Sequence, residues 1–196
     1  MEKRNWKRSV TLKQRMVLCL AAFFAAFALQ LALNGYQARA VQQVQDDQMG
    51  NFNAISRFQG GVESSISILE AYRWENGETE EMLEKLRAAC STSNAWLWRI
   101  RSNMDGLQNV SDEQWVLYGA VETTYGSYNT LLEELESYLS SGQEAKASQL
   151  YYNKVSVCGG YLSQYTMQLL KASILDAQTT YTEISELGER IALMQI

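Results

Sequence analysis

Histidine and proline are absent from the 196 residues, and cysteine occurs only three times. Without histidine, these residues cannot form a His-ligated metal site, a Ser-His-Asp triad or a Cys-His nucleophile pair, and they offer no histidine phosphoacceptor. The sequence also lacks a GxxxxGK(S/T) phosphate-binding loop and a GxGxxG dinucleotide motif. We therefore expect no catalytic residue, no metal ion and no cofactor in this part of the protein.

The missing proline permits long helices, because proline is the strongest breaker of a helix interior. Breaks must then come from clusters of Gly, Asn and Ser. The three cysteines do not define a disulfide framework, since Cys19 lies in an apolar run. Cys90 and Cys158 could form a disulfide in an oxidising compartment, or each could be a small buried side chain. The sequence leaves both alternatives open.

Charge is distributed unevenly along the chain. Residues 1–15 contain six basic side chains and one acidic side chain, a net charge of +5, whereas the remainder contains 11 basic and 21 acidic side chains. Lys and Arg that flank a membrane-spanning helix stay on the cytoplasmic side. This pattern predicts a cytoplasmic N-terminus and an extracytoplasmic main domain at the cell membrane. Nucleic-acid binding is not expected, because the basic residues form a tail and not a folded basic face.

Residues 16–33 form an apolar run with no charged side chain. A membrane-spanning helix needs roughly 17 to 25 such residues, so we expect a transmembrane helix at residues 16–35. A cleaved signal peptide is the alternative, with Ala38-Arg39-Ala40 as its cleavage site. We favour the uncleaved anchor, because the apolar part of a signal peptide usually has only about 7 to 15 residues.

Four segments after the apolar run show the apolar period of an α-helix, and none shows the alternation of a β-strand. They are separated by Asn76-Gly77, Asp105-Gly106 and Ser140-Ser141-Gly142. The first has apolar and small polar residues spaced three and four apart from Val41 to Tyr72, and the last has a heptad pattern from Leu170 to Ile191. The third opens with a predicted capping box, in which the Ser111 and Gln114 side chains each bond the other's backbone N–H.

Four helices with short turns predict an all-α fold, an up-down-up-down four-helix bundle whose first and last helices are longer than the inner two. A chain that crosses such a domain four times returns to the membrane. The expected organisation is a cytoplasmic tail at 1–15, a transmembrane helix at 16–35, an extracytoplasmic helical domain at 36–190 and the start of a second transmembrane helix at 191–196. A second spanning segment is expected after Ile196.

The segment Lys7 to Met16 (KRSVTLKQRM) leads directly into the apolar run and then into a heptad-patterned helix. This arrangement resembles the N-terminal region of bacterial transmembrane sensor histidine kinases with a helical extracellular sensor region. Similar Ser-x-x-Leu-Lys-x-Arg sequences occur in methyl-accepting chemoreceptors. The resemblance implies a sensory input region that forms a homodimer and passes ligand-induced helix shifts across the membrane to a kinase. A non-signalling, membrane-anchored scaffold or envelope protein is the alternative from another class.

An aromatic-lined pocket is one hypothesis for the ligand site, because helical rise places several aromatic and basic residues at similar heights in such a bundle. Its residues are Trp96, Arg99, Trp115, Tyr118, Tyr161 and Tyr165, and the segment Cys158-Gly159-Gly160 would leave space beside the tyrosines. The alternative is that these aromatics simply fill the core, which we favour. Arg73 and Trp74 form a second candidate, for a protein partner. Calcium binding is not expected, because the acidic runs do not converge in a loop.

Overall fold

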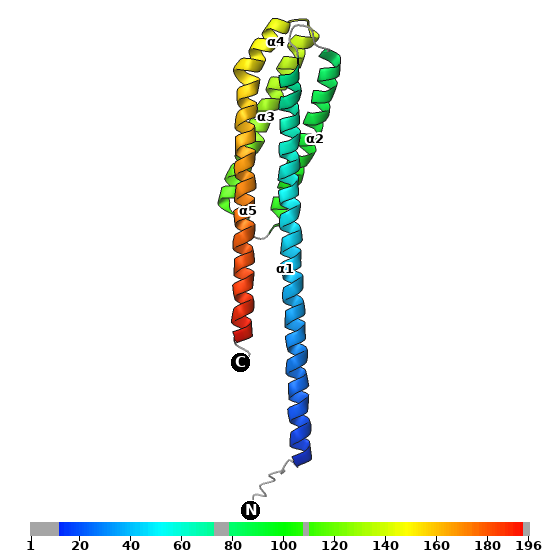
Figure 1. The fold of residues 1–196 in the computed structure, drawn as a ribbon, viewed down its shortest axis with the longest axis vertical. Coiled ribbons are helices and arrows are strands. Elements are labelled where there is room, and N and C mark those ends of the chain that lie inside the picture. Colours follow the sequence, from blue (N-terminus) through cyan, green and yellow to red (C-terminus); the bar gives the residue numbers. More distant parts are fainter. Residues whose placement is uncertain (1–11, 73–78, 108–109, 194–196) are drawn as a thin grey trace, which may run out of the picture. The chain divides into compact units, whose positions relative to one another are not determined.

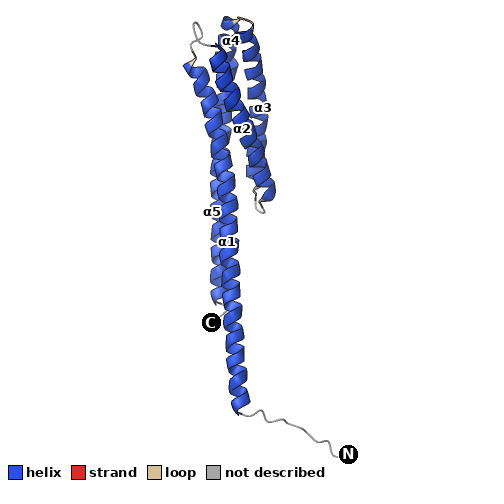
Figure 2. Cartoon of the chain, turned by 90° about the vertical axis from the view of Figure 1, so that its right-hand side faces the viewer, coloured by secondary structure: helices blue, strands red, loops and turns tan. Residues whose placement is uncertain are grey.

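The computed structural model describes residues 12–72, 79–107 and 110–193, and the regular structure in these ranges is entirely helical (Figures 1 and 2). In chain order the elements are α1 (Leu12–Ala71), α2 (Thr79–Gly106), α3 (Asp112–Ser140), α4 (Glu144–Leu150), a π-helical turn η1 (Tyr151–Val155) and α5 (Ser156–Leu193). The prediction of an all-helical chain with four long helices is confirmed.

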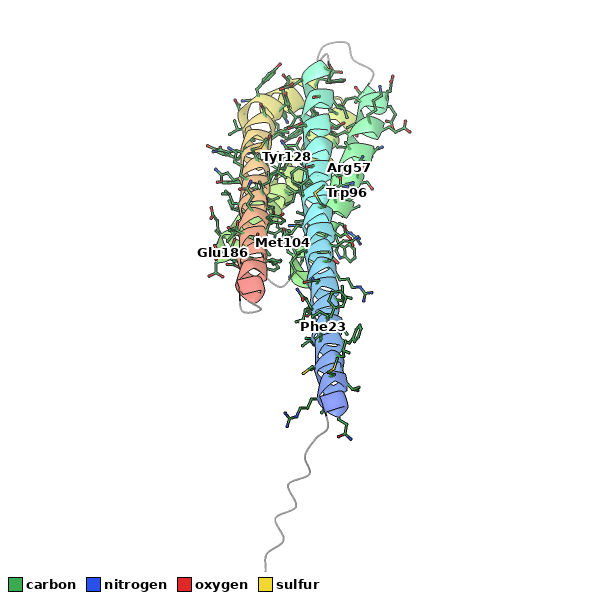
Figure 3. The ribbon with its side chains drawn as sticks, turned by 60° about the horizontal axis from the view of Figure 1, so that its bottom comes forward. Phe23, Arg57, Trp96, Met104, Tyr128 and Glu186 are labelled. Carbon is green, nitrogen blue, oxygen red and sulfur yellow. The ribbon has the colours of Figure 1, made fainter. Side chains whose placement is uncertain are left out.

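The chain divides into two compact units, residues 1–43 and residues 44–196. Helix α1 contributes residues to both. In the first unit its apolar side chains are exposed, as Phe23 illustrates in Figure 3. By length and composition, α1 is the one described helix able to cross a membrane, and none of its most apolar stretch, with a mean hydropathy of 2.4, is buried.

In the second unit, α1 buries one continuous face. Its members are Asn51, Ala54, Ile55, Phe58, Val62, Ser65 and Leu69, and the buried Tyr72 follows directly after the helix. Most of these residues carry the three-and-four spacing seen in the sequence, so that pattern is used for packing inside the chain. The spacing on α1 therefore does not by itself require a second copy.

Aromatic residues of α3 fill the space against α1. The Phe58 and Tyr125 rings meet edge to face, with their centroids 5.3 Å apart. The Ser65 hydroxyl donates to the Val62 carbonyl (2.7 Å) and therefore accepts from the Tyr128 hydroxyl (3.0 Å). Tyr128, labelled in Figure 3, is only 1% exposed. A buried tyrosine needs such a partner for its hydroxyl.

Two glycines mark close approaches between helices. A Cβ on Gly61 of α1 would clash with Ser93 Oγ of α2. A Cβ on Gly159 of α5 would lie 3.2 Å from Ile66 Cδ1 and 3.3 Å from Tyr128 Cε2. Neighbouring side chains thus lie close to the Cβ position of Gly159, whereas a Cβ on Gly160 would meet no atom within 4 Å. A space for a ligand beside these glycines stays a prediction.

The start of α3 forms only half of the predicted capping box. The Gln114 backbone N–H donates to Ser111 Oγ (3.3 Å), as expected. The Ser111 backbone N–H donates instead to the Asp176 carboxylate of α5 (3.2 Å), and the Gln114 side chain enters the core. The competing partner is on α5, so local sequence alone could not reveal it.

The predicted stop after α3 is a glycine-dependent helix end. Gly142 has φ 70°, a left-handed conformation that glycine adopts without a Cβ penalty. The Gln143 N–H donates to the Tyr138 carbonyl (2.8 Å), and the Gly142 N–H donates to the Leu139 carbonyl (3.0 Å). This pair of bonds is the Schellman pattern, which satisfies the last carbonyls of a helix.

The expected single fourth helix from near Gln143 is interrupted by the π-helical turn. The buried positions Tyr151, Val155 and Gly159 are spaced four apart twice in succession. In a regular α-helix these two steps would rotate the buried face by about 80°. The wider π turn absorbs that rotation and keeps the buried residues of α4 and α5 directed at the same core.

Candidate functional site

The six residues of the predicted aromatic site lie on three helices, and four of them form two separate ring pairs. On α3, the Trp115 and Tyr118 rings meet edge to face with centroids 6.1 Å apart. On α5, the Tyr161 and Tyr165 rings are stacked with centroids 6.5 Å apart. Both pairs are formed within a single helix, so they do not by themselves join the helices into one site.

Tyr118 is a core residue with an outward-reaching hydroxyl. The side chain is buried, and its hydroxyl donates to the Glu122 carboxylate (3.0 Å), which also lies 3.5 Å from the Arg101 guanidinium. Burial, together with the Glu122 carboxylate, raises the pKa of Tyr118 to about 12. Its contacts are those of a packed tyrosine whose polar end remains satisfied.

The other predicted residues differ in exposure. Trp96 on α2 and Tyr165 are half-buried and pack against the core, whereas Arg99 and Tyr161 are exposed. Trp96 is labelled in Figure 3. The contacts of Trp96, Tyr118 and Tyr165 are those of core residues. A ligand role for the six stays a prediction.

A different feature of the surface is a groove between α2 and α3, with a volume of about 410 Å³. Its lining residues are Leu86, Arg87, Cys90, Ser91 and Asn94 from α2, and Tyr125, Asn129, Leu132, Glu133 and Glu136 from α3. We call it the α2–α3 groove. None of the six predicted residues lines it. Its volume lies in the range of about 300 to 1,000 Å³ that is usual for small-molecule sites.

One end of the α2–α3 groove is charged. The Arg87 guanidinium donates to the Glu136 carboxylate through Nε (3.1 Å) and through a second nitrogen, and it lies 3.8 Å from the Glu80 carboxylate. The hydrogen bonds and negative charge of Glu136, and then Glu80 and Glu84, raise the pKa of Arg87. Several carboxylates thus surround a single cation, and Glu133 adds another negative charge to the lining.

The floor of the α2–α3 groove is apolar and chemically unreactive. Burial raises the pKa of the Cys90 thiol to about 11, and a thiol that keeps its proton is a poor nucleophile. The Tyr125 hydroxyl donates to the Cys90 carbonyl (2.8 Å), and burial raises the pKa of Tyr125 to about 12. Cys90 therefore lacks the lowered pKa of an activated nucleophile.

The sequence contained a signal for this groove that the aromatic spacing obscured. Arg87 and Asn94 are seven residues apart on α2, and Asn129, Glu133 and Glu136 follow helical spacing on α3. Both sets lie beside buried stripes. Polar residues in such positions are usually solvated, so the signal identifies a groove only once the partner helix is known.

The structure also answers the question that the sequence left open about the cysteines. Cys90 and Cys158 are both free thiols, and Cys158 donates weakly to the Thr124 carbonyl (3.7 Å). Within the described ranges, no three Cys, Asp or Glu side chains converge to hold a metal ion. Arg73 and Trp74, the second predicted candidate, lie outside the described residues.

Comparison of the chain with protein-family models, with curated proteins and with solved structures finds no match.

Proposed function

We propose that this chain is the sensory input region of a membrane signalling receptor, of the sensor histidine kinase type that its N-terminal segment resembles. The observation that carries the proposal is the composition of α1. A single helix, Leu12–Ala71, contains an exposed apolar segment long enough to span a membrane and a buried face that builds the core of the second unit. A helix that is anchored in both places can transmit a displacement between them.

In the proposed topology, the four long helices form an up-down-up-down bundle on the extracytoplasmic side. Short connections after α1, α2 and α3 support antiparallel neighbours. Figure 1 shows α2, α3 and α5 beside the part of α1 that belongs to the second unit. In this topology α5 runs back towards the membrane and is the output helix.

The α2–α3 groove is the proposed ligand site of this receptor. Its charged end and its amides offer donors and acceptors, while Leu86 and Leu132 offer an apolar surface. A ligand that binds one arrangement of α2 and α3 more tightly than another shifts the population between them. Since α3 packs extensively against α5, such a shift reaches the proposed output helix.

Membrane orientation can be tested with single cysteines in the full chain after Cys19, Cys90 and Cys158 are replaced by serine. Ser137→Cys places a thiol on an exposed position of α3, and Ser9→Cys places one in the basic tail. A membrane-impermeant maleimide applied to intact cells should label Ser137→Cys, and it should label Ser9→Cys only after lysis. Labelling of the opposite cysteine would reject the proposed orientation.

The signalling output is tested by the gene sequence beyond the codon for Ile196. A receptor requires a second apolar segment of about 20 residues, followed by a helical relay and a kinase region that contains the phosphoacceptor histidine. A methyl-accepting cytoplasmic region in place of the kinase would identify a chemoreceptor with the same kind of input region. A polar end soon after Ile196 would reject signalling and favour the anchored scaffold.

A further inference from the structure

Three polar side chains from three helices meet inside the core of the second unit. Asn51 of α1, Gln114 of α3 and Ser173 of α5 are 0%, 1% and 3% exposed. The Asn51 side-chain amide donates to Ser173 Oγ (3.4 Å), and the Gln114 side-chain amide donates to the same oxygen (3.2 Å). We call these three residues the polar layer.

The polar layer is short of hydrogen-bond donors. Asn51 Oδ1 and Gln114 Oε1 are buried, and no donor among the described residues reaches either of them. Exchanging the nitrogen and oxygen of one amide does not repair this, because Ser173 has a single hydroxyl hydrogen and can serve only one amide oxygen. At least one buried acceptor therefore lacks a protein donor in every arrangement, which costs free energy.

The buried hydroxyl seven residues before Ser173 has a hydrogen-bond partner within the protein. Thr166 occupies the same face of α5 as Ser173, seven residues earlier, and is 0% exposed. Its hydroxyl donates to the Leu162 carbonyl of its own helix (2.8 Å). A buried hydroxyl on α5 can thus find an acceptor within its own helix. The missing hydrogen-bond donors are therefore a property of the polar layer and not of every buried polar residue on α5.

The polar layer lies close to the point where Ser111, the N-cap of α3, is hydrogen-bonded to α5. One turn of α5 after Ser173, Asp176 accepts the hydrogen bond from the Ser111 N–H. Gln114 lies in the first turn of α3. At this level side-chain hydrogen bonds to Ser173 and Asp176 join α5 to α1 and α3, next to the buried Leu169 and Ala172. Farther along the bundle, Phe58, Tyr125, Tyr128 and Leu162 are buried.

We propose that the polar layer is a binding site for a buried water molecule, and that α5 separates from α1 and α3 most readily at this level. Water can donate to an amide oxygen that the protein leaves without a donor, and buried waters usually bond to such groups. Where water supplies part of the hydrogen bonding between helices, fewer direct protein–protein contacts have to break when the helices separate. This inference rests on the packing of the second unit and does not depend on the proposed function.

The test is amide hydrogen exchange on the full chain in lipid nanodiscs, followed by mass spectrometry. The variant Asn51→Leu/Gln114→Met/Ser173→Ala replaces the polar layer with apolar side chains of similar size. Replacing a partly satisfied buried polar cluster by apolar groups is often stabilising. We expect amides around residues 169–177 to exchange at least about tenfold more slowly than in the native chain.

Two further variants make the result specific. Gln114→Met alone leaves Ser173 with one amide to serve, so it should also slow exchange at residues 169–177, with less disturbance of the core. The matched control Thr166→Val removes a satisfied hydroxyl from the same face of α5 and should leave exchange at residues 169–177 equal to that of the native chain or faster.

The proposal is overturned if both layer variants fold and exchange at residues 169–177 as fast as the native chain. It is also overturned if Thr166→Val slows exchange as much as Gln114→Met, since burial alone would then explain the effect. A crystal structure of the native chain should show a water within hydrogen-bonding distance of Asn51 Oδ1 or Gln114 Oε1. A well-ordered layer without such a water would equally reject the proposal.

Discussion

At the scale of single residues, burial controls the chemistry of Cys90 in the α2–α3 groove. Its thiol has a pKa of about 11 in place of the ordinary 9.0, so at pH 8 its thiolate fraction is about 100-fold lower. We predict correspondingly slow alkylation by iodoacetamide, measured in the full chain by peptide mass spectrometry between pH 7 and pH 10. The matched control is Ser91→Cys in a Cys90→Ser background, because residue 91 is exposed. Equal rates at pH 8 would contradict the prediction.

The same burial links Cys90 to stability. The folded chain holds the thiol proton more tightly than the unfolded chain does, so the stabilisation is complete below pH 9.0. It declines as pH rises from 9.0 towards about 11, where the folded form also ionises. Replacing Cys90 by alanine should remove this part of the decline in the free energy of unfolding.

The neighbouring glycines of α1 give a matched pair for a second prediction. Gly60 is exposed with open space around it, so Gly60→Ala should raise the free energy of unfolding by about 0.5 to 1 kcal/mol through helix propensity. Gly61→Ala should lower it by about 1 to 3 kcal/mol, because the new Cβ meets Ser93 Oγ. Thermal unfolding in detergent, followed by circular dichroism, measures both.

Ser93 provides the control for that steric explanation. If the clash with its hydroxyl is the cause, Ser93→Ala should restore most of the stability lost in Gly61→Ala. A Gly61→Ala variant that is as stable as Gly60→Ala would show that the Ser93 side chain adopts another rotamer without loss of stability.

Residue-scale features were also the ones that the sequence predicted least well. The sequence favoured a core position for Tyr118, but it gave no indication that Tyr125 packs on Phe58 of α1. The Gln114 side chain was expected to cap its own helix and instead bonds to Ser173, 59 residues away. Such contacts depend on which helices are neighbours, and a single sequence carries little information about that.

At the scale of elements, the sequence predicted the four long helices, but it did not predict the π-helical turn that interrupts the last of them. Helices α2 and α3 end at the predicted breaks Asp105-Gly106 and Ser140-Gly142, because glycine and small polar residues end helices for local reasons. Helix α1 ends at Ala71, and the predicted break at Asn76-Gly77 lies outside the described residues. The π turn was missed. Its cause is a drift of the buried face along Tyr151, Val155 and Gly159, which becomes visible only when the core is known.

The π turn predicts how α5 tolerates deletions. Removing the exposed Asn153 should convert η1 into regular α-helix while the flanking buried faces keep their direction. The free energy of unfolding should then stay within about 1 kcal/mol of the native value. Removing the exposed Gln168 rotates the following part of α5 by about 100° relative to the core. That variant should lose more than about 3 kcal/mol.

Circular dichroism at 222 nm during thermal unfolding compares the two deletions in one experiment. Equal losses of stability would mean that the turn is built into the packing of Tyr151 and Val155 and does not simply absorb an extra residue.

At the scale of the whole molecule, the structure changes where a second copy is expected. The three-and-four spacing on α1 is buried inside the chain from Asn51 to Leu69, so this part of α1 is not free to contact a second copy. On α5 the residues buried in the core are Leu162, Thr166, Leu169, Ser173 and Thr180. The heptad set on the neighbouring face of α5 is partly exposed. That set is Leu170, Ile174, Ala177, Tyr181 and Ile184. If the chain forms the proposed homodimer, α5 is the better candidate for the contact.

Disulfide crosslinking in native membranes distinguishes these faces, using a full chain in which Cys19, Cys90 and Cys158 are serine. Tyr181→Cys, on the exposed heptad set, should form a crosslinked dimer under mild oxidation. Thr179→Cys is the matched control, because it lies roughly 160° around the same helix and is also exposed. Strong crosslinking at 179 with none at 181 would place the contact on the opposite face. Crosslinking at neither position would argue against a dimer through this helix, and signals passing along α5 would then have to act within a single chain.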